Sequence, residues 1–109
     1  MATHRNIMAC FLAYSLGSPA NSQDMSWQEK CEAMSQIAYK VMVNHQDRVP
    51  LEEALRLQEG REESMGTVLK MIILDAYEIP RYGTPESKAN AARDYADQTL
   101  LSCLRAQER

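Results

Sequence analysis

Two side chains in this sequence of 109 residues are spaced so that they could bind a soft metal ion. Met42 and His45 are three positions apart, so on one helix a thioether and an imidazole could face the same copper ion. A core methionine and a histidine at a helix end explain the same pair without a metal, and no third ligand is visible near them. We therefore expect neither a metal nor another cofactor, and treat a copper site at Met42 and His45 as the weaker hypothesis.

Catalysis would need an activated nucleophile or two positioned acids. Outside the first twenty residues, His45 is the only histidine, and no serine or cysteine has the sequence context of an activated nucleophile. Asp and Glu are plentiful, but their spacing is the one that solvated helix faces produce. The sequence therefore predicts a protein that is not an enzyme.

Residues 1–20 have the layout of a secretory signal peptide. Arg5 precedes an apolar run at 7–16, and Ser18 and Ala20 are the small residues expected before a cleavage site. The run has about ten residues, whereas a helix that spans a bilayer needs roughly twenty. The alternative is an amphipathic N-terminal helix of a cytosolic protein. We expect cleavage after Ala20, which leaves a single domain of residues 21–109, with no membrane span, in the periplasm or the medium.

The cysteine count agrees with export. Of the three cysteines, Cys10 would leave with the signal peptide, and Cys31 and Cys103 would remain. An even pair in a small exported domain is typical of a disulfide. In a cytosolic protein the same two residues would be separate buried thiols.

The segment 64–82 predicts a helix that ends before Pro80. Its apolar residues recur at helical spacing, and Met71 and Leu74 widen the apolar stripe until little of the helix surface is left for water. We expect this helix to be mostly buried under the others, and any part that a short second helix leaves uncovered would favour a homodimer. The expected apolar positions are Met65, Val68, Leu69, Ile72, Ile73, Ala76 and Ile79.

Three other helices are indicated by signals at their N-termini. Ser26 and Glu29 form a capping box at the start of the first helix. Pro50 opens a short second helix, and Thr84 followed by proline begins the last one. No segment alternates with the period of a strand. The sequence predicts an all-α bundle of three longer helices and one short one, in which the disulfide joins the first and last helices if these run antiparallel.

The chain resembles a group of small, uncharacterised exported proteins of proteobacteria and phages. The likeness covers residues 26–105, and its one distinctive part is the segment A-Y-E-x-P-R-Y at 76–82. The shared features also include Cys31 early in a Met-rich first helix, a V-P-L segment at 49–51, and a last helix that closes with Cys103 and leucine. The resemblance implies export and a two-cysteine helical domain, and it implies no activity.

Four residues could form a surface for another protein. Tyr77, Arg81 and Tyr82 combine two aromatic rings with an arginine beside a proline, which is the composition of a binding hot spot. Trp27 at the start of the first helix could also belong to a binding surface. The alternative for all four residues is that they serve only local packing.

The charge of the chain excludes some classes of partner. The formal net charge is −3, and no block of either sign is present. A nucleic-acid binder would need a basic face to neutralise phosphates. We therefore expect an exported protein that acts through an unknown protein partner, as an inhibitor, an immunity-type partner, an accessory subunit or a stress chaperone. The alternative is a binder of small molecules or copper that uses a pocket between helices.

Overall fold

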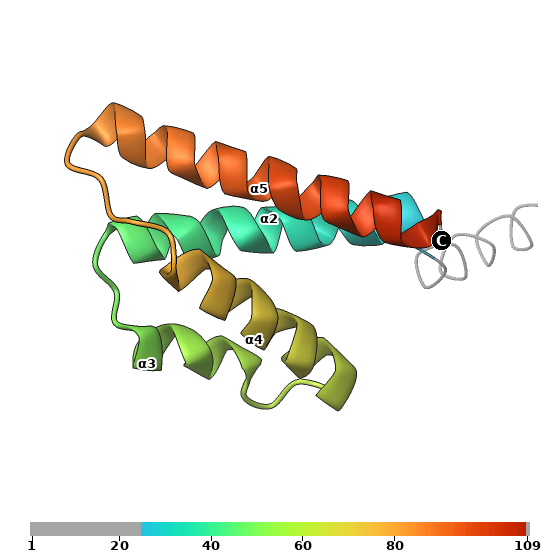
Figure 1. Ribbon diagram of the computed structural model, residues 1–109. Coiled ribbons are helices and arrows are strands. Elements are labelled where there is room, and N and C mark those ends of the chain that lie inside the picture. The colour runs from blue at the N-terminus through green and yellow to red at the C-terminus, as the bar shows by residue number, and fades with distance from the viewer. Residues whose placement is uncertain (1–24, 109) are drawn as a thin grey trace, which may run out of the picture.

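The computed structural model describes residues 25–108, and every regular element in that range is a helix (Figure 1). This confirms the all-α bundle of three longer helices and one short one. The predicted signal peptide, residues 1–20, lies outside the described residues. Among the helices of residues 25–108, none combines the length and the hydrophobicity that crossing a bilayer requires. In chain order the elements are α2 (Trp27–Gln46), α3 (Leu51–Leu55), the 3₁₀ helix η1 (Arg56–Gln58), α4 (Glu63–Tyr77) and α5 (Pro85–Gln107).

The two longest helices, α2 and α5, lie side by side and antiparallel (Figure 1). Cys31 near the start of α2 is bonded to Cys103 near the end of α5, with their Cα atoms 5.5 Å apart. The predicted disulfide is confirmed, and the two helices have the antiparallel arrangement that it requires. Helix α4 packs against α2, and α3 with η1 packs against α4 (Figure 1).

The predicted helix starts are present. The hydroxyl oxygen of Ser26 accepts the Glu29 N–H at 3.1 Å, and the Glu29 carboxylate accepts the Ser26 N–H at 2.9 Å, which completes the capping box. These bonds to the charged form lower the pKa of Glu29. At α5, Thr84 accepts the Ser87 N–H at 3.1 Å and Pro85 occupies the first turn. Both helices therefore begin at a residue whose side-chain oxygen accepts one of the free N–H groups of the first turn.

The core lies where α2, α4 and α5 meet, and α3 adds one residue to it. Large side chains such as Met42 and Ile73 are fully buried, and burying each stabilises the fold by about 2 kcal/mol. Alanines from all four helices let the backbones approach closely. The buried cluster consists of Ala38, Val41, Met42, Ala54, Ile72, Ile73, Ala76, Ala92 and Tyr95.

Helix α4 is less buried than its sequence predicts, and this expectation was wrong. One face carries buried residues, namely Gly66, Leu69, Ile72, Ile73 and Ala76. Its other apolar side chains face solvent: Val68 and Leu74 are 38% exposed, and Met71 is 59% exposed. The physical reason is that α2 and α5 pair with each other, so α4 flanks this pair instead of lying at its centre, and the short α3 covers only one side of α4.

Candidate functional site: a groove between α4 and α5

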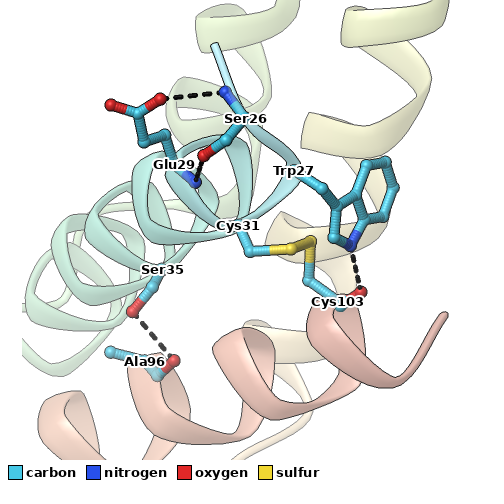
Figure 2. Close-up of a disulfide and its surroundings, with 7 residues drawn as sticks. All are labelled: Ser26, Trp27, Glu29, Cys31, Ser35, Ala96 and Cys103. Carbon is cyan, nitrogen blue, oxygen red and sulfur yellow. Dashed lines mark hydrogen bonds between the residues drawn. A yellow bond between two sulfur atoms is a disulfide. The ribbon is translucent and has the colours of Figure 1, made fainter. Parts of the chain in front are cut away.

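The disulfide end of the bundle holds Trp27 as well as the two cysteines (Figure 2). The indole N–H of Trp27 donates to the carbonyl oxygen of Cys103 at 3.0 Å, and Cys31 is fully buried. Further along the same contact, the hydroxyl of Ser35 donates to the carbonyl oxygen of Ala96 at 3.0 Å (Figure 2). These bonds fix the first turns of α2 to the last turns of α5.

The segment predicted as an interaction surface joins α4 to the other end of α2. The Tyr77 hydroxyl donates to the Val49 carbonyl at 2.7 Å, and the Arg81 Nε donates to the His45 carbonyl at 2.7 Å. Arg81 therefore satisfies a carbonyl at the C-terminus of α2, where a cation also suits the helix dipole. The Tyr82 ring stays 42% exposed. Polar groups of this turn thus hold the bundle together, and a face of Tyr82 remains free for contact.

The four residues of the predicted surface do not form one patch. Trp27 begins α2, whereas Tyr77, Arg81 and Tyr82 surround the end of α2. Because α2 has 20 residues, these two ends are about 30 Å apart. Trp27 is 38% exposed and belongs instead to the groove described below.

The two candidate copper ligands lie in the core. Met42 is fully buried and its sulfur accepts a hydrogen bond from Gln46 at 3.5 Å. His45 is 4% exposed, and its Nε2 lies 2.6 Å from the carbonyl oxygen of Ile79, so Nε2 carries the proton. The Nδ1 of His45 is buried without a partner among residues 25–108. In that same range no cluster of three or more His, Cys, Asp or Glu residues is arranged to hold a metal ion.

Gln46 is a structural residue that the sequence analysis missed. It is 2% exposed, its amide nitrogen donates to the Pro80 carbonyl at 2.9 Å, and its amide oxygen accepts the Tyr82 N–H at 2.8 Å. A usable signal was present, because Gln46 follows Ala38 and Met42 at steps of four along the buried stripe of α2. A polar residue on such a stripe predicts a buried hydrogen-bonding side chain.

A groove of about 810 Å³ runs between α4 and α5 and reaches the first turn of α2. Most of its lining is apolar, and its two charged lining residues are Asp75 and Glu78 at the end of α4. Only Trp27 of the predicted surface residues takes part. The other lining residues are Met34, Val68, Met71, Ile72, Ile79, Tyr95, Gln98, Thr99, Ser102, Cys103 and Ala106.

Tyr95 forms the buried side of this groove. It is 7% exposed, and its hydroxyl donates to the Ile72 carbonyl, which ties α5 to α4. Burial, with a smaller effect from the negative charge of Asp75, raises the pKa of Tyr95 to about 12. The Tyr95 proton is therefore retained at physiological pH, and the groove offers an apolar surface bordered by carboxylates.

Comparisons of the chain with protein-family models, with curated proteins and with solved structures found no match. The resemblance carried by the segment 76–82 therefore stays a prediction. The position of that segment is known, and its polar groups serve the contact between α2 and the turn after α4.

Proposed function

We propose that this protein acts after export by binding another protein through the groove between α4 and α5, without catalysing a reaction. The observation that carries the proposal is the exposure of Met71, at 59%, and Val68, at 38%, in a groove whose walls are held in place. Apolar side chains gathered in one concave surface are typical of a contact site, because their exposure to water costs free energy that a partner recovers. An inhibitor, an immunity-type partner, an accessory subunit and a stress chaperone would all act in this way.

The walls of the groove are rigid on one side and adaptable on the other. The disulfide and the Trp27 hydrogen bond fix the α2 and α5 side, which limits the entropy lost on binding. On the α4 side, Met71 adds a flexible, polarisable side chain that can follow the shape of a partner.

Photocrosslinking in cells that naturally produce the protein tests this proposal. A benzophenone amino acid placed at Met71 should give one discrete adduct, and the adduct should disappear when Val68→Glu is added. The same amino acid at Leu101, which is 49% exposed and outside the groove, is the matched control. Equal adducts from both positions, or none from position 71, would contradict binding through the groove.

Export is supported by the disulfide, since such bonds form and persist in oxidising compartments. The intact mass of the protein from the envelope fraction tests it. We expect a mass that begins at Asn21 and two thiols, Cys31 and Cys103, that react only after reduction. A mass that retains residues 1–20 with three free thiols would mean that the N-terminus is not a signal peptide.

A small-molecule binder is the second candidate, favoured by the groove volume of about 810 Å³. Volumes of about 300–1,000 Å³ are usual for sites that enclose small ligands. The copper version has less support, because the Met42 sulfur and the His45 Nε2 are already hydrogen-bonded in the core. Calorimetry with Cu(I) should give no binding heat, and heat that disappears in His45→Gln would favour the copper site.

A further inference from the structure

The charges that line the groove all have one sign. Asp75 and Glu78 are its two ionisable carboxylates, and no lysine, arginine or histidine lines it. Both carboxylates are exposed, so they are hydrated and available to a partner. A partner without a cation at this place would remove the water around the two carboxylates and offer no positive charge to compensate for it.

The carboxylates continue an apolar stripe along α4. Val68, Met71, Asp75 and Glu78 follow one another at steps of three, four and three, so they lie on one face of the helix. The face is apolar in its first half and acidic in its second half. A complementary surface must therefore present apolar side chains first and positive charge about one helical turn further on.

The length of the groove fits a helix. On α5 its lining extends from Tyr95 to Ala106, which is about 16 Å along the axis, or three helical turns. An amphipathic helix places its anchors at i, i+3 or i+4, and i+7 over the same distance. From the shape, the methionines and the charge pattern, we infer that the groove binds an amphipathic helix of a partner protein, with an apolar face of about three turns and a lysine or arginine next to Asp75 and Glu78. This inference rests on the proposed function, since it names the kind of partner.

A second copy of this chain fits the same charge pattern poorly. Two copies packed groove to groove would bring four carboxylates and no basic lining residue into one interface. The chain also carries a formal net charge of −3, which opposes self-association at low salt.

Fluorescence anisotropy with designed peptides tests the inference on the disulfide-bonded protein. The probes are helical peptides of about four turns with leucines at i, i+3, i+7 and i+10. They differ only in two residues just past one end of the leucine stripe, which are both lysine, both glutamine or both glutamate. Lysine pairs are placed at either end, so that both orientations are sampled. We expect the better lysine peptide to bind roughly five-fold tighter than the glutamine peptide, with an advantage that falls as salt increases.

Charge-neutral variants assign the effect to the two carboxylates. In Asp75→Asn/Glu78→Gln the lysine and glutamine peptides should bind about equally. The control Glu86→Gln/Asp97→Asn removes the same charge from exposed positions of α5 outside the groove, and should keep the preference for lysine.

The outcomes separate this inference from the proposed function. Equal binding of all the peptides to the unmodified protein, lost in Met71→Glu but kept in Leu101→Glu, would overturn the charge inference and leave the groove as a contact site. Binding of none of the peptides, or binding that Met71→Glu does not weaken, would overturn both. Sedimentation could show a dimer that Met71→Glu abolishes and Leu101→Glu does not. A second copy of the chain would then occupy the groove, and the inference would be overturned.

Discussion

The indole N–H of Trp27 donates to the carbonyl oxygen of Cys103, and Cys103 is itself bonded through sulfur to Cys31, one helical turn after Trp27. Two independent bonds thus join the first turns of α2 to the end of α5 (Figure 2). Trp27 and Cys103 both line the groove. The same bonds that stabilise the fold therefore also position one end of the candidate binding site.

Trp27→Phe should keep an aromatic ring in the groove but remove the hydrogen bond to Cys103. We expect the free energy of unfolding to fall by about 1 kcal/mol, the usual net worth of one hydrogen bond. Urea denaturation measures this change. Tyr39→Phe, at another exposed aromatic position of α2, is the control and should have almost no effect. Equal effects of both substitutions would mean that the Trp27 bond adds nothing to stability.

Loss of the disulfide should have a larger effect. Cys31 and Cys103 are 72 positions apart, and closing a loop of that length stabilises a protein by about 4 kcal/mol in the chain-entropy model. In non-reducing buffer, Cys31→Ala/Cys103→Ala should lower the free energy of unfolding measured by urea denaturation by about 4 kcal/mol. Addition of a reductant should not change the stability of this double variant further. A double variant within about 1 kcal/mol of the native protein would show that packing of α2 on α5 suffices.

Gln46→Ala should destabilise the fold although the residue is polar. The substitution leaves the Pro80 carbonyl and the Tyr82 N–H without their buried partner, which costs about 2–3 kcal/mol. Gln28→Ala, at an exposed position of the same helix, should change stability by less than about 0.5 kcal/mol. Faster hydrogen exchange at the Tyr82 amide would locate the effect, and unchanged exchange there would contradict it.

Substitutions on the two faces of α4 should change the stability of the fold by very different amounts. Ile73 is fully buried, so Ile73→Ala should cost about 2–5 kcal/mol through lost burial and a cavity. Met71 is 59% exposed, so Met71→Gln should change stability by less than about 0.5 kcal/mol. Thermal unfolding of the two variants separates the faces. A large loss of stability in Met71→Gln would show that the groove is filled in the native protein.

The helices could be predicted from sequence because their signals are local. A capping box needs only Ser26 and Glu29. The pairing of Cys31 with Cys103 was predicted from the number of cysteines left after the expected loss of Cys10. The groove could not be predicted. Helical spacing shows that Met71 lies on an apolar stripe, but the neighbour that covers each part of the stripe depends on which helices pair, and here α2 pairs with α5. The buried position of Gln46 could be predicted from its spacing, but its hydrogen-bond partners could not, because they come from the turn after α4.

The titration of Tyr95 gives the protein a predicted loss of stability at alkaline pH. Burial and the charge of Asp75 raise the pKa of Tyr95 from 10.0, the value for an unperturbed tyrosine, to about 12 in the folded protein. Between these two values the unfolded chain has released the proton and the folded protein still holds it. The folded state then binds more protons, so stability is complete below pH 10, falls as the pH rises towards 12, and has lost on the order of 2 kcal/mol above it.

Denaturation at a series of pH values checks this loss. The difference in near-ultraviolet phenolate absorbance between the native protein and Tyr95→Phe separates the titration of Tyr95 from that of the other tyrosines. Tyr95→Phe lacks the titrating group and should show a flatter profile between pH 10 and 12, although it starts from a lower stability because the hydrogen bond to the Ile72 carbonyl is missing. Asp75→Asn should move the Tyr95 titration to lower pH, since removing a nearby negative charge makes the phenolate easier to form. A profile of Tyr95→Phe parallel to that of the native protein would assign the alkaline loss to other groups, and an unmoved titration in Asp75→Asn would mean that burial alone sets the pKa of Tyr95.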